Sequence, residues 1–122
     1  MVAVVLCIIS MAVSAFAQTD YSDNNKITFS LSFSSNKANC SVEIKGADGT
    51  TSISNCTVTL TDSKGNEVKS WSGLSATGPK LIVSKSASGV VKGEKYILSV
   101  IATVHRDGSS ETVSDSFTAT YN

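Results

Sequence analysis

Residues 96–121 read YILSVIATVHRDGSSETVSDSFTATY and contain two runs in which apolar and polar residues alternate. Such a period of two is typical of a β-strand with one buried face. A two-residue turn at Asp107–Gly108 would pair Arg106 with Ser109. Counting outward then sets three apolar pairs opposite one another: Ala102 with Val113, Leu98 with Phe117, and Tyr96 with Ala119. The stretch therefore predicts an antiparallel hairpin with one apolar face.

Similar alternation recurs along the rest of the chain, while no stretch shows a helical period. We predict strands over residues 26–34, 40–45, 56–61, 67–71, 80–84, 96–104 and 112–121. Val68 and Trp71 are out of phase with each other, so a bulge is expected between them. Turn signals separate the runs, at Ala47–Gly49, Ser63–Asn66, Ser72–Gly73, Gly78–Pro79 and Asp107–Gly108. About seven short strands joined by turns predict an all-β antiparallel sandwich.

The segment VVKGEKYILSVIATV, residues 90–104, resembles strand F of fibronectin type III modules and related immunoglobulin-like sandwiches. In those families a hydrophobic residue and a Gly turn precede a Tyr and alternating aliphatic residues. The resemblance implies an immunoglobulin-like (fibronectin type III-like) β-sandwich of about seven strands. It also implies that the Tyr96 hydroxyl bonds upstream backbone while its ring packs in the core. The chain resembles, more loosely, small single-domain secreted proteins of bacteria.

Three features depart from that family pattern. Lys92 stands where fibronectin type III modules usually have Pro, and the Trp of an early core strand is missing. The strand from Tyr96 to Val104 has no Cys that could form the interstrand disulfide of antibody domains. The resemblance therefore concerns the fold and implies nothing specific about function.

The first 17 residues, MVAVVLCIISMAVSAFA, form an apolar run that ends in an Ala-x-Ala pattern. This pattern predicts a signal peptide cleaved between Ala17 and Gln18, and hence a secreted, extracellular protein. Because no Lys or Arg precedes the run, either the terminal amine supplies the charge or the true start lies upstream. An uncleaved membrane anchor is the alternative, at the lower limit of spanning length. We expect a flexible leader at residues 18–25 and one domain at residues 26–122.

The charges of the chain balance, with 10 Lys and Arg against 10 Asp and Glu. Without a basic stripe, nucleic acid is not expected as a partner, nor is a membrane once the signal is cleaved. Balanced charge also gives no sign of an acidic disordered tail. The expected partner is therefore an extracellular protein or glycan, contacted by a monomer.

The phrase NCSVEI at residues 39–44 returns as NCTVTL at residues 55–60. Four interpretations are open: two strand starts of similar composition, a Cys40–Cys56 disulfide, a metal site, or glycan acceptors at Asn39 and Asn55. Two Cys make only half of a tetrahedral metal site, and the single His lies in a distant hairpin, so no metal or cofactor is expected. Glycosylation would depend on the host. We expect two neighbouring strands joined by a disulfide, with two buried thiols as the alternative.

Two turn registers are compatible with that pairing. A three-residue loop at Ala47–Gly49 would set Cys40 opposite Cys56, with Cβ atoms about 5 Å apart. A two-residue turn would instead set Cys40 opposite Thr57, on the other face of the sheet from Cys56. A bulge near Asn55 would then restore the phase. The sequence supports both registers.

A search for chemistry finds no catalytic set. His105 adjoins a turn, no nucleophile-elbow motif or phosphate-binding Gly loop is present, and Asp62, Gly65 and Glu67 fit a hairpin turn better than a calcium loop. The protein is therefore not expected to be an enzyme. A small hydrolase that depends on His105 is kept as a third class.

Binding is the remaining class of function. We predict a secreted, non-catalytic binding or adhesion-type module that uses Asp48, Trp71, His105, Arg106 and Asp107. Trp71 fits core packing or an exposed stacking surface, and Tyr21 is a second aromatic that could stack on a ligand. The polar row Thr57, Thr59 and Thr61 fits a solvated strand face or a flat contact surface. The alternative function is a self-associating structural subunit that assembles through edge strands.

Overall fold

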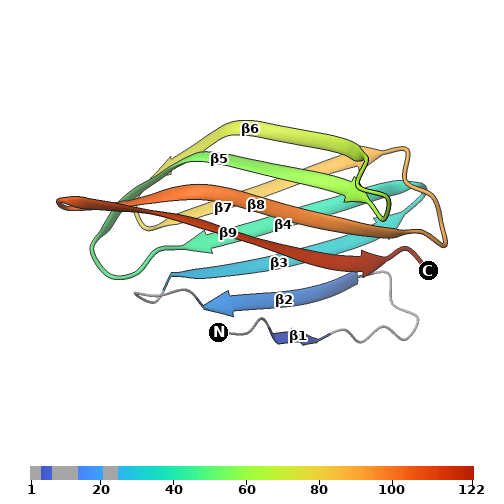
Figure 1. Cartoon of the computed structure of the whole chain (residues 1–122), viewed down its shortest axis with the longest axis horizontal. Helices are drawn as coiled ribbons and strands as arrows, with labels where there is room; N and C mark the ends of the chain where they lie inside the picture. The colour runs from blue at the N-terminus through green and yellow to red at the C-terminus, as the bar shows by residue number, and fades with distance from the viewer. Residues whose placement is uncertain (1–3, 7–13, 21–24) are drawn as a thin grey trace.

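A computed structural model describes residues 4–6, 14–20 and 25–122 (Figure 1). These residues form strands and connections, without a helix. The strands are β1 (Val4–Leu6), β2 (Ser14–Asp20), β3 (Lys26–Ser34), β4 (Lys37–Lys45), β5 (Thr50–Asp62), β6 (Glu67–Thr77), β7 (Lys80–Ser88), β8 (Lys95–Arg106) and β9 (Ser109–Thr120). The seven predicted strands correspond to β3–β9.

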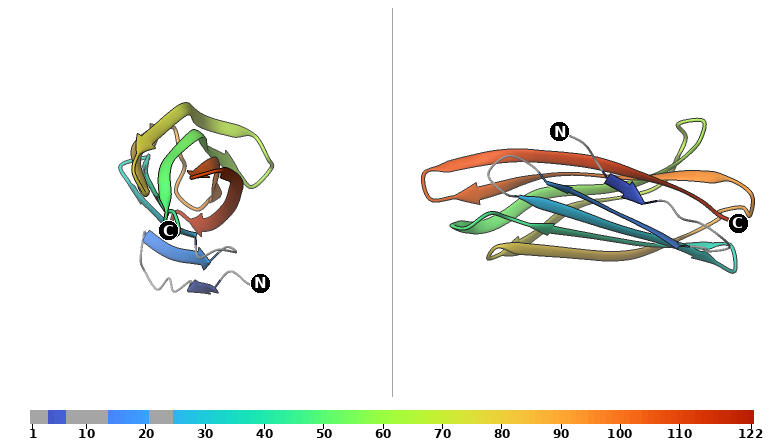
Figure 2. Two further views of the ribbon diagram at one scale, coloured as in Figure 1. Left: turned by 90° about the vertical axis from the view of Figure 1, so that its left-hand side faces the viewer. Right: turned by 90° about the horizontal axis from the view of Figure 1, so that it is seen from below.

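The strands form two antiparallel sheets packed face to face. One sheet has the order β1-β2-β3-β4-β7 and the other has the order β6-β5-β8-β9. The end-on view in Figure 2 shows the two sheets curving around a shared interior. The fold is thus the immunoglobulin-like β-sandwich that the sequence predicts. Strand β6 pairs with β5 and not with β7, so the arrangement differs from that of constant-type immunoglobulin domains.

The hairpin predicted over residues 96–121 is confirmed pair by pair. Strands β8 and β9 pair Arg106 with Ser109 and keep one register as far as Lys95 and Thr120. Gly108 has a φ of +78° while Asp107 keeps a negative φ, which is the pattern of a type II turn, and glycine adopts this conformation without strain. Leu98 and Phe117, an opposed pair, are both buried. A tight turn therefore determines the register of this half of the second sheet.

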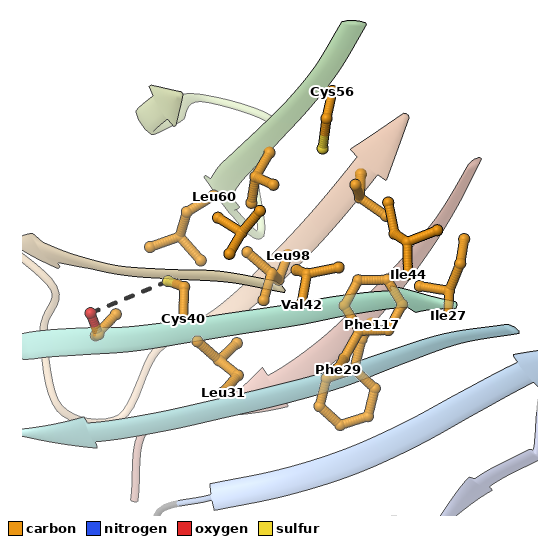
Figure 3. Packing of buried hydrophobic residues seen from close by; sticks show 14 of the residues in the cluster. Ile27, Phe29, Leu31, Cys40, Val42, Ile44, Cys56, Leu60, Leu98 and Phe117 are labelled. Carbon is orange, nitrogen blue, oxygen red and sulfur yellow. Dashed lines mark hydrogen bonds between the residues drawn. The ribbon is translucent and has the colours of Figure 1, made fainter. Parts of the chain in front are cut away.

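The core takes one face of each sheet. Strand β3 shows the pattern clearly, because Ile27, Phe29, Leu31 and Phe33 are buried while the residues between them are not. The stacked rings of Phe29 and Phe117, with centroids 6.0 Å apart, join the two sheets (Figure 3). Aromatic pairs of this kind stabilise a core beyond their buried area.

Tyr96 forms the corner that the family resemblance implies. Its side chain is buried, and its hydroxyl accepts a hydrogen bond of 2.8 Å from the backbone N–H of Val91. The ring packs against Phe33 of the other sheet, with centroids 5.7 Å apart. This contact fixes the loop between β7 and β8 over the end of the core.

The expected pairing of the two repeated phrases is wrong. Strand β4, which holds the first phrase, pairs with β3 and β7, whereas β5, which holds the second, pairs with β6 and β8. The Ala47–Gly49 segment crosses from one sheet to the other instead of closing a hairpin. Both proposed turn registers fail for this reason. The repeat arises because both strands present a Cys, a Val and an aliphatic residue to one core.

The expected disulfide is absent. Cys40 and Cys56 are free, buried thiols, and Figure 3 shows them on strands of opposite sheets. Burial raises the pKa of each thiol to about 11. Both thiols are therefore protonated at neutral pH and act as small apolar core residues.

Irregularities occur where the sequence breaks phase. The β5–β6 pairing shifts between Leu60–Lys69 and Thr61–Glu67, which leaves Val68 as the bulge residue expected there. Ser72–Gly73 is not a turn as predicted but a second irregularity inside β6. Asn55 has a φ of +52° at a shift in β5, a conformation that Asn tolerates better than most residues. The predicted bulge near Asn55 thus exists, but it lies in the pairing of β5 with β6 and β8 and not in a pairing of β5 with β4.

The N-terminal predictions are only partly covered by the described residues. Much of the predicted signal peptide, and Tyr21, lie outside them. Ala17 and Gln18 lie inside β2, which pairs with β3. Asn25, the last residue of the predicted leader, is fully buried.

Replacing Tyr96 with Phe tests the corner. The substitution removes the hydroxyl and leaves the Val91 N–H without that acceptor, so we expect a loss of about 1 kcal/mol in the free energy of unfolding, measured by urea denaturation. Ser84→Ala removes an exposed hydroxyl from β7 and serves as the control, with little expected change. Equal stability of Tyr96→Phe and the unsubstituted protein would contradict the assigned contact.

The cysteines provide a second test. In the folded protein at neutral pH, Cys40 and Cys56 should react slowly with a maleimide because both are buried and protonated. In denaturant without reductant both should react rapidly. Mass spectrometry of the labelled peptides gives the measurement. If the two cysteines react only after a reductant is added, they form a disulfide, and the assignment of free thiols is wrong.

Candidate binding site

Several turns that are distant in the sequence gather at one end of the sandwich, on the left in Figure 1. They are the segment between β4 and β5, the connection between β6 and β7, and the turn between β8 and β9. Hydrogen bonds link the first two, because Gly46 N–H donates to Pro79 O and Gly78 N–H donates to Thr51 O, each at 2.7 Å. Strand pairing brings the third alongside, since Thr50 lies opposite Arg106.

This end carries a shallow hollow of about 580 Å³, which we call the end hollow. Its lining residues are Lys26, Lys45, Gly46, Ala47, Asp48, Arg106 and Ser109. Three of them are cationic and one is acidic. The hollow is open to solvent and fits a polar ligand better than an apolar one.

Strand register places three lysines directly opposite one another, and two of them, Lys26 and Lys45, line the hollow. Lys26 of β3 pairs with Lys45 of β4, and Lys45 pairs with Lys80 of β7. All three are exposed and occupy the outer face of their sheet. We call this set the lysine row. Only Lys80 has a near carboxylate, with its Nζ 3.8 Å from Glu43, among the ion pairs found in the described part of the chain. Like charges in opposed positions destabilise a sheet.

A buried polar network supports the floor of the hollow. The Asn25 amide donates to Glu111 at 2.7 Å, and its carbonyl oxygen accepts from Ala47 N–H and from the Arg106 guanidinium, each at 2.8 Å. Arg106 also lies 3.5 Å from Glu111. One side chain therefore holds three connected parts of the chain in place. Because Glu111 neutralises Arg106, the uncompensated positive charge of the hollow comes from its lysines.

The start of β5 is fixed by close packing. The Thr50 hydroxyl and N–H both donate to the Ala47 carbonyl, at 2.6 and 3.1 Å. A Cβ on Gly46 would collide with the Thr50 side chain, so only glycine fits there. The lining segment between Lys45 and Asp48 thus has a defined shape.

The structure brings together four of the five predicted site residues. Asp48 and Arg106 line the end hollow, and His105 and Asp107 are their neighbours at the same end. The His105 Nε2 lies 2.7 Å from the Ser54 hydroxyl, which holds the ring against β5. Trp71 is elsewhere: it lies within β6 opposite Val58, half-buried against the core. The core interpretation of Trp71 therefore applies.

Sequence reasoning missed the lysines and Asn25. Lys26 and Lys45 sit at the ends of predicted strands, but only their pairing shows that they face one another. Asn25 was assigned to a leader because its neighbours are polar. A single buried Asn leaves no periodic signal, so the sequence alone could not identify it.

Other predicted features have structural roles. Asp62 closes the β5–β6 turn by accepting hydrogen bonds from Asn66 and Lys64 N–H, both at 2.9 Å, and these bonds lower the pKa of its carboxyl. No cluster of three or more metal-ligating side chains occurs among the described residues. Within the same residues, no helix is long and apolar enough to cross a membrane.

Comparisons with known proteins add little. No family model matches the chain, and no curated protein does. A solved structure, the GAE domain of GGA2p from Saccharomyces cerevisiae, is similar with a TM-score of 0.44 and 17% identity. The similarity covers 84% of this chain and 94% of that chain. A likeness of this degree carries no argument about function.

Replacing Asn25 with Ala tests the network. The change removes the acceptor of the Ala47 N–H and one hydrogen bond each from Arg106 and Glu111, so we expect a loss of about 2–3 kcal/mol in the free energy of unfolding. Asn39→Ala, at an exposed position on β4, is the matched control. Chemical denaturation of both variants gives the comparison, and equal stabilities would show that the network does not hold this end.

Proposed function

We propose that this protein is a secreted, non-catalytic binding module that contacts an anionic group of an extracellular ligand through the end hollow. The lysine row carries the proposal. Opposed lysines cost stability in a sheet, and a bound anion would relieve that repulsion. The rigid Asn25 network supports the idea because a preorganised site loses less entropy on binding.

The fibronectin type III-like variant of the fold belongs to the same proposal. The Tyr96 corner and the pairing of β6 with β5 support it. Modules of this architecture present loops at the two ends of the sandwich, where binding sites can form without disturbing the core. The end hollow occupies such a position.

Neutralising two of the lysines tests the function. Lys26→Gln/Lys45→Gln should weaken binding to dextran sulfate about tenfold, because two charge contacts are lost. Poly-glutamate as a second probe distinguishes carboxylates of a protein ligand from sulfates of a glycan. Binding is measured by surface plasmon resonance, with uncharged dextran as the polymer control.

The matched control is Lys64→Gln/Lys92→Gln, which removes two exposed lysines from the opposite end of the sandwich. It has the same net charge as the test variant, so it should bind as the unsubstituted protein does. Equal weakening in both double variants would indicate non-specific attraction. That result, or no binding to either anionic probe at low salt, would reject the end hollow as the site.

A further inference from the structure

The domain formed by β3–β9 has four sheet edges, at β3, β6, β7 and β9. These edges differ in whether the edge strand carries a charged residue on its inward face. An unpaired edge can add a strand from another chain, and a charged residue on the inward face of the edge strand discourages this. Strand β6 carries Lys69 opposite Leu60, β7 carries Lys85 opposite Cys40, and β9 carries Asp115 opposite Val100. Opposed residues share a face, and these partners are buried, so each charge lies on the core side of its strand.

Asp115 shows that this arrangement has a cost. Its Oδ2 is buried and has no hydrogen-bond partner among the described residues, while its Oδ1 accepts from Ser116 N–H. A buried unpaired carboxylate oxygen destabilises the fold. Its presence at an edge is consistent with protection against strand addition.

Strand β3 has no such charge. Its inward residues are Ile27, Phe29, Leu31 and Phe33, all buried. It is also the strand whose open side is covered in the structure, because β2 pairs with it from Ser14–Ser32 to Asp20–Lys26 (Figure 1). The edge without a protecting charge is therefore the edge that receives a strand.

The hydrogen-bonding groups of this edge can be assigned from the β3–β4 turn. Ser35 and Asn36 have φ angles of +51° and +60°, typical of a type I′ turn that makes Ser34–Lys37 a hydrogen-bonded pair. Alternate residues then direct their N–H and C=O groups to opposite sides. Phe29 and Leu31 therefore present theirs to the edge that β2 occupies.

Cleavage at the predicted site would uncover most of this edge. The cut between Ala17 and Gln18 falls inside β2, and the remaining residues Gln18–Asp20 pair only with Thr28, Ile27 and Lys26. The backbone groups of Phe29 and Leu31 would lose their partner strand. A short remnant of this kind holds an edge weakly.

We propose that removal of residues 1–17 opens the β3 edge and that the edge then pairs, antiparallel, with the β3 edge of a second copy of this chain. A pairing that matches the whole of Lys26–Ser34 with itself is centred on Ser30. It sets Phe29 opposite Leu31 and Ile27 opposite Phe33 of the second copy, which continues the apolar face. Lys26 lies opposite Ser34, so no like charges meet. The product is a six-stranded sheet, β7-β4-β3 joined to its copy.

The second copy is favoured as occupant because β3 paired with itself matches apolar face with apolar face and brings no like charges together. In the centred register Ser30 meets Ser30 of the other copy as a non-hydrogen-bonded pair, the arrangement in which opposed side chains are closest. Ser30 is partly exposed on the outer face, so a larger side chain there does not enter the core. This position therefore tests the interface without disturbing the fold.

The experiment uses the natively exported protein, with its N-terminus at Gln18 verified by intact mass, in sedimentation equilibrium. We expect a dimer. Ser30→Lys and Ser30→Glu should each raise the dimer dissociation constant about tenfold or more, because like charges are opposed across the two-fold axis. An equal mixture of the two variants should restore the dimer, as a heterodimer with opposite charges paired. Circular dichroism confirms that each variant is folded.

Ser84→Lys is the matched control, because it places the same charge in the same row of the sheet but on β7. It should leave the dimer unchanged. The uncleaved chain, in which β2 still covers β3, should be monomeric. A monomeric exported protein, a dimer insensitive to Ser30→Lys, an exported protein that retains residues 1–17, or an uncleaved chain that dimerises equally well would each overturn the proposal.

Discussion

The burial of one face of each sheet against the other is the constraint on which the structure depends. Every strand from β3 to β9 must supply apolar residues at alternate positions, and the stacking of Phe29 on Phe117 shows the two sheets meeting. Since the core uses one face of each strand, the other faces are left to Ser, Thr and Lys. The turns lie at the ends, where Tyr96 fixes one and Asn25 fixes the other. The hydrogen bonds of Tyr96 and Asn25 thus hold the connections that cover the two ends of the apolar core.

A sandwich, unlike a closed barrel, has edges, and this one treats them unequally. Lys69 and Lys85 have long side chains that can carry their charge outward from an inward-facing position. Asp115 is short, and one of its oxygens stays buried and unpaired. A charge at Phe29 or Leu31 would remove the ring stacking or the aliphatic packing of β3. Protection of the β3 edge would therefore weaken the core directly, and pairing with another strand satisfies the edge without that loss.

From the sequence, it is easier to predict which side chains of a strand face the core than to predict which strands pair with one another. The β8–β9 register was predicted because a two-residue turn at Asp107–Gly108 leaves a single way to pair its flanks. The Ala47–Gly49 signal failed because a loop of this kind can also carry the chain from one sheet to the other. Nothing local distinguishes these outcomes, since Cys40 and Cys56 face inward in both. The disulfide prediction depended on the hairpin and failed with it.

For the candidate site, the turn residues could be predicted from the sequence, whereas the cluster of lysines could not. Asp48 and Arg106 follow from turn chemistry, whereas Lys26 and Lys45 meet only through the β3–β4 register, which also buries Ile27 opposite Ile44. Side chains alternate, so that buried pair forces the residues next to it into opposition on the outer face. Elsewhere on this face the same register opposes small neutral residues, such as Ser30 with Ser41. A serine at position 26 or 45 would have removed the repulsion without affecting the core. The fold therefore does not require lysines at these two positions, and the proposed contact with an anion would give them a physical reason.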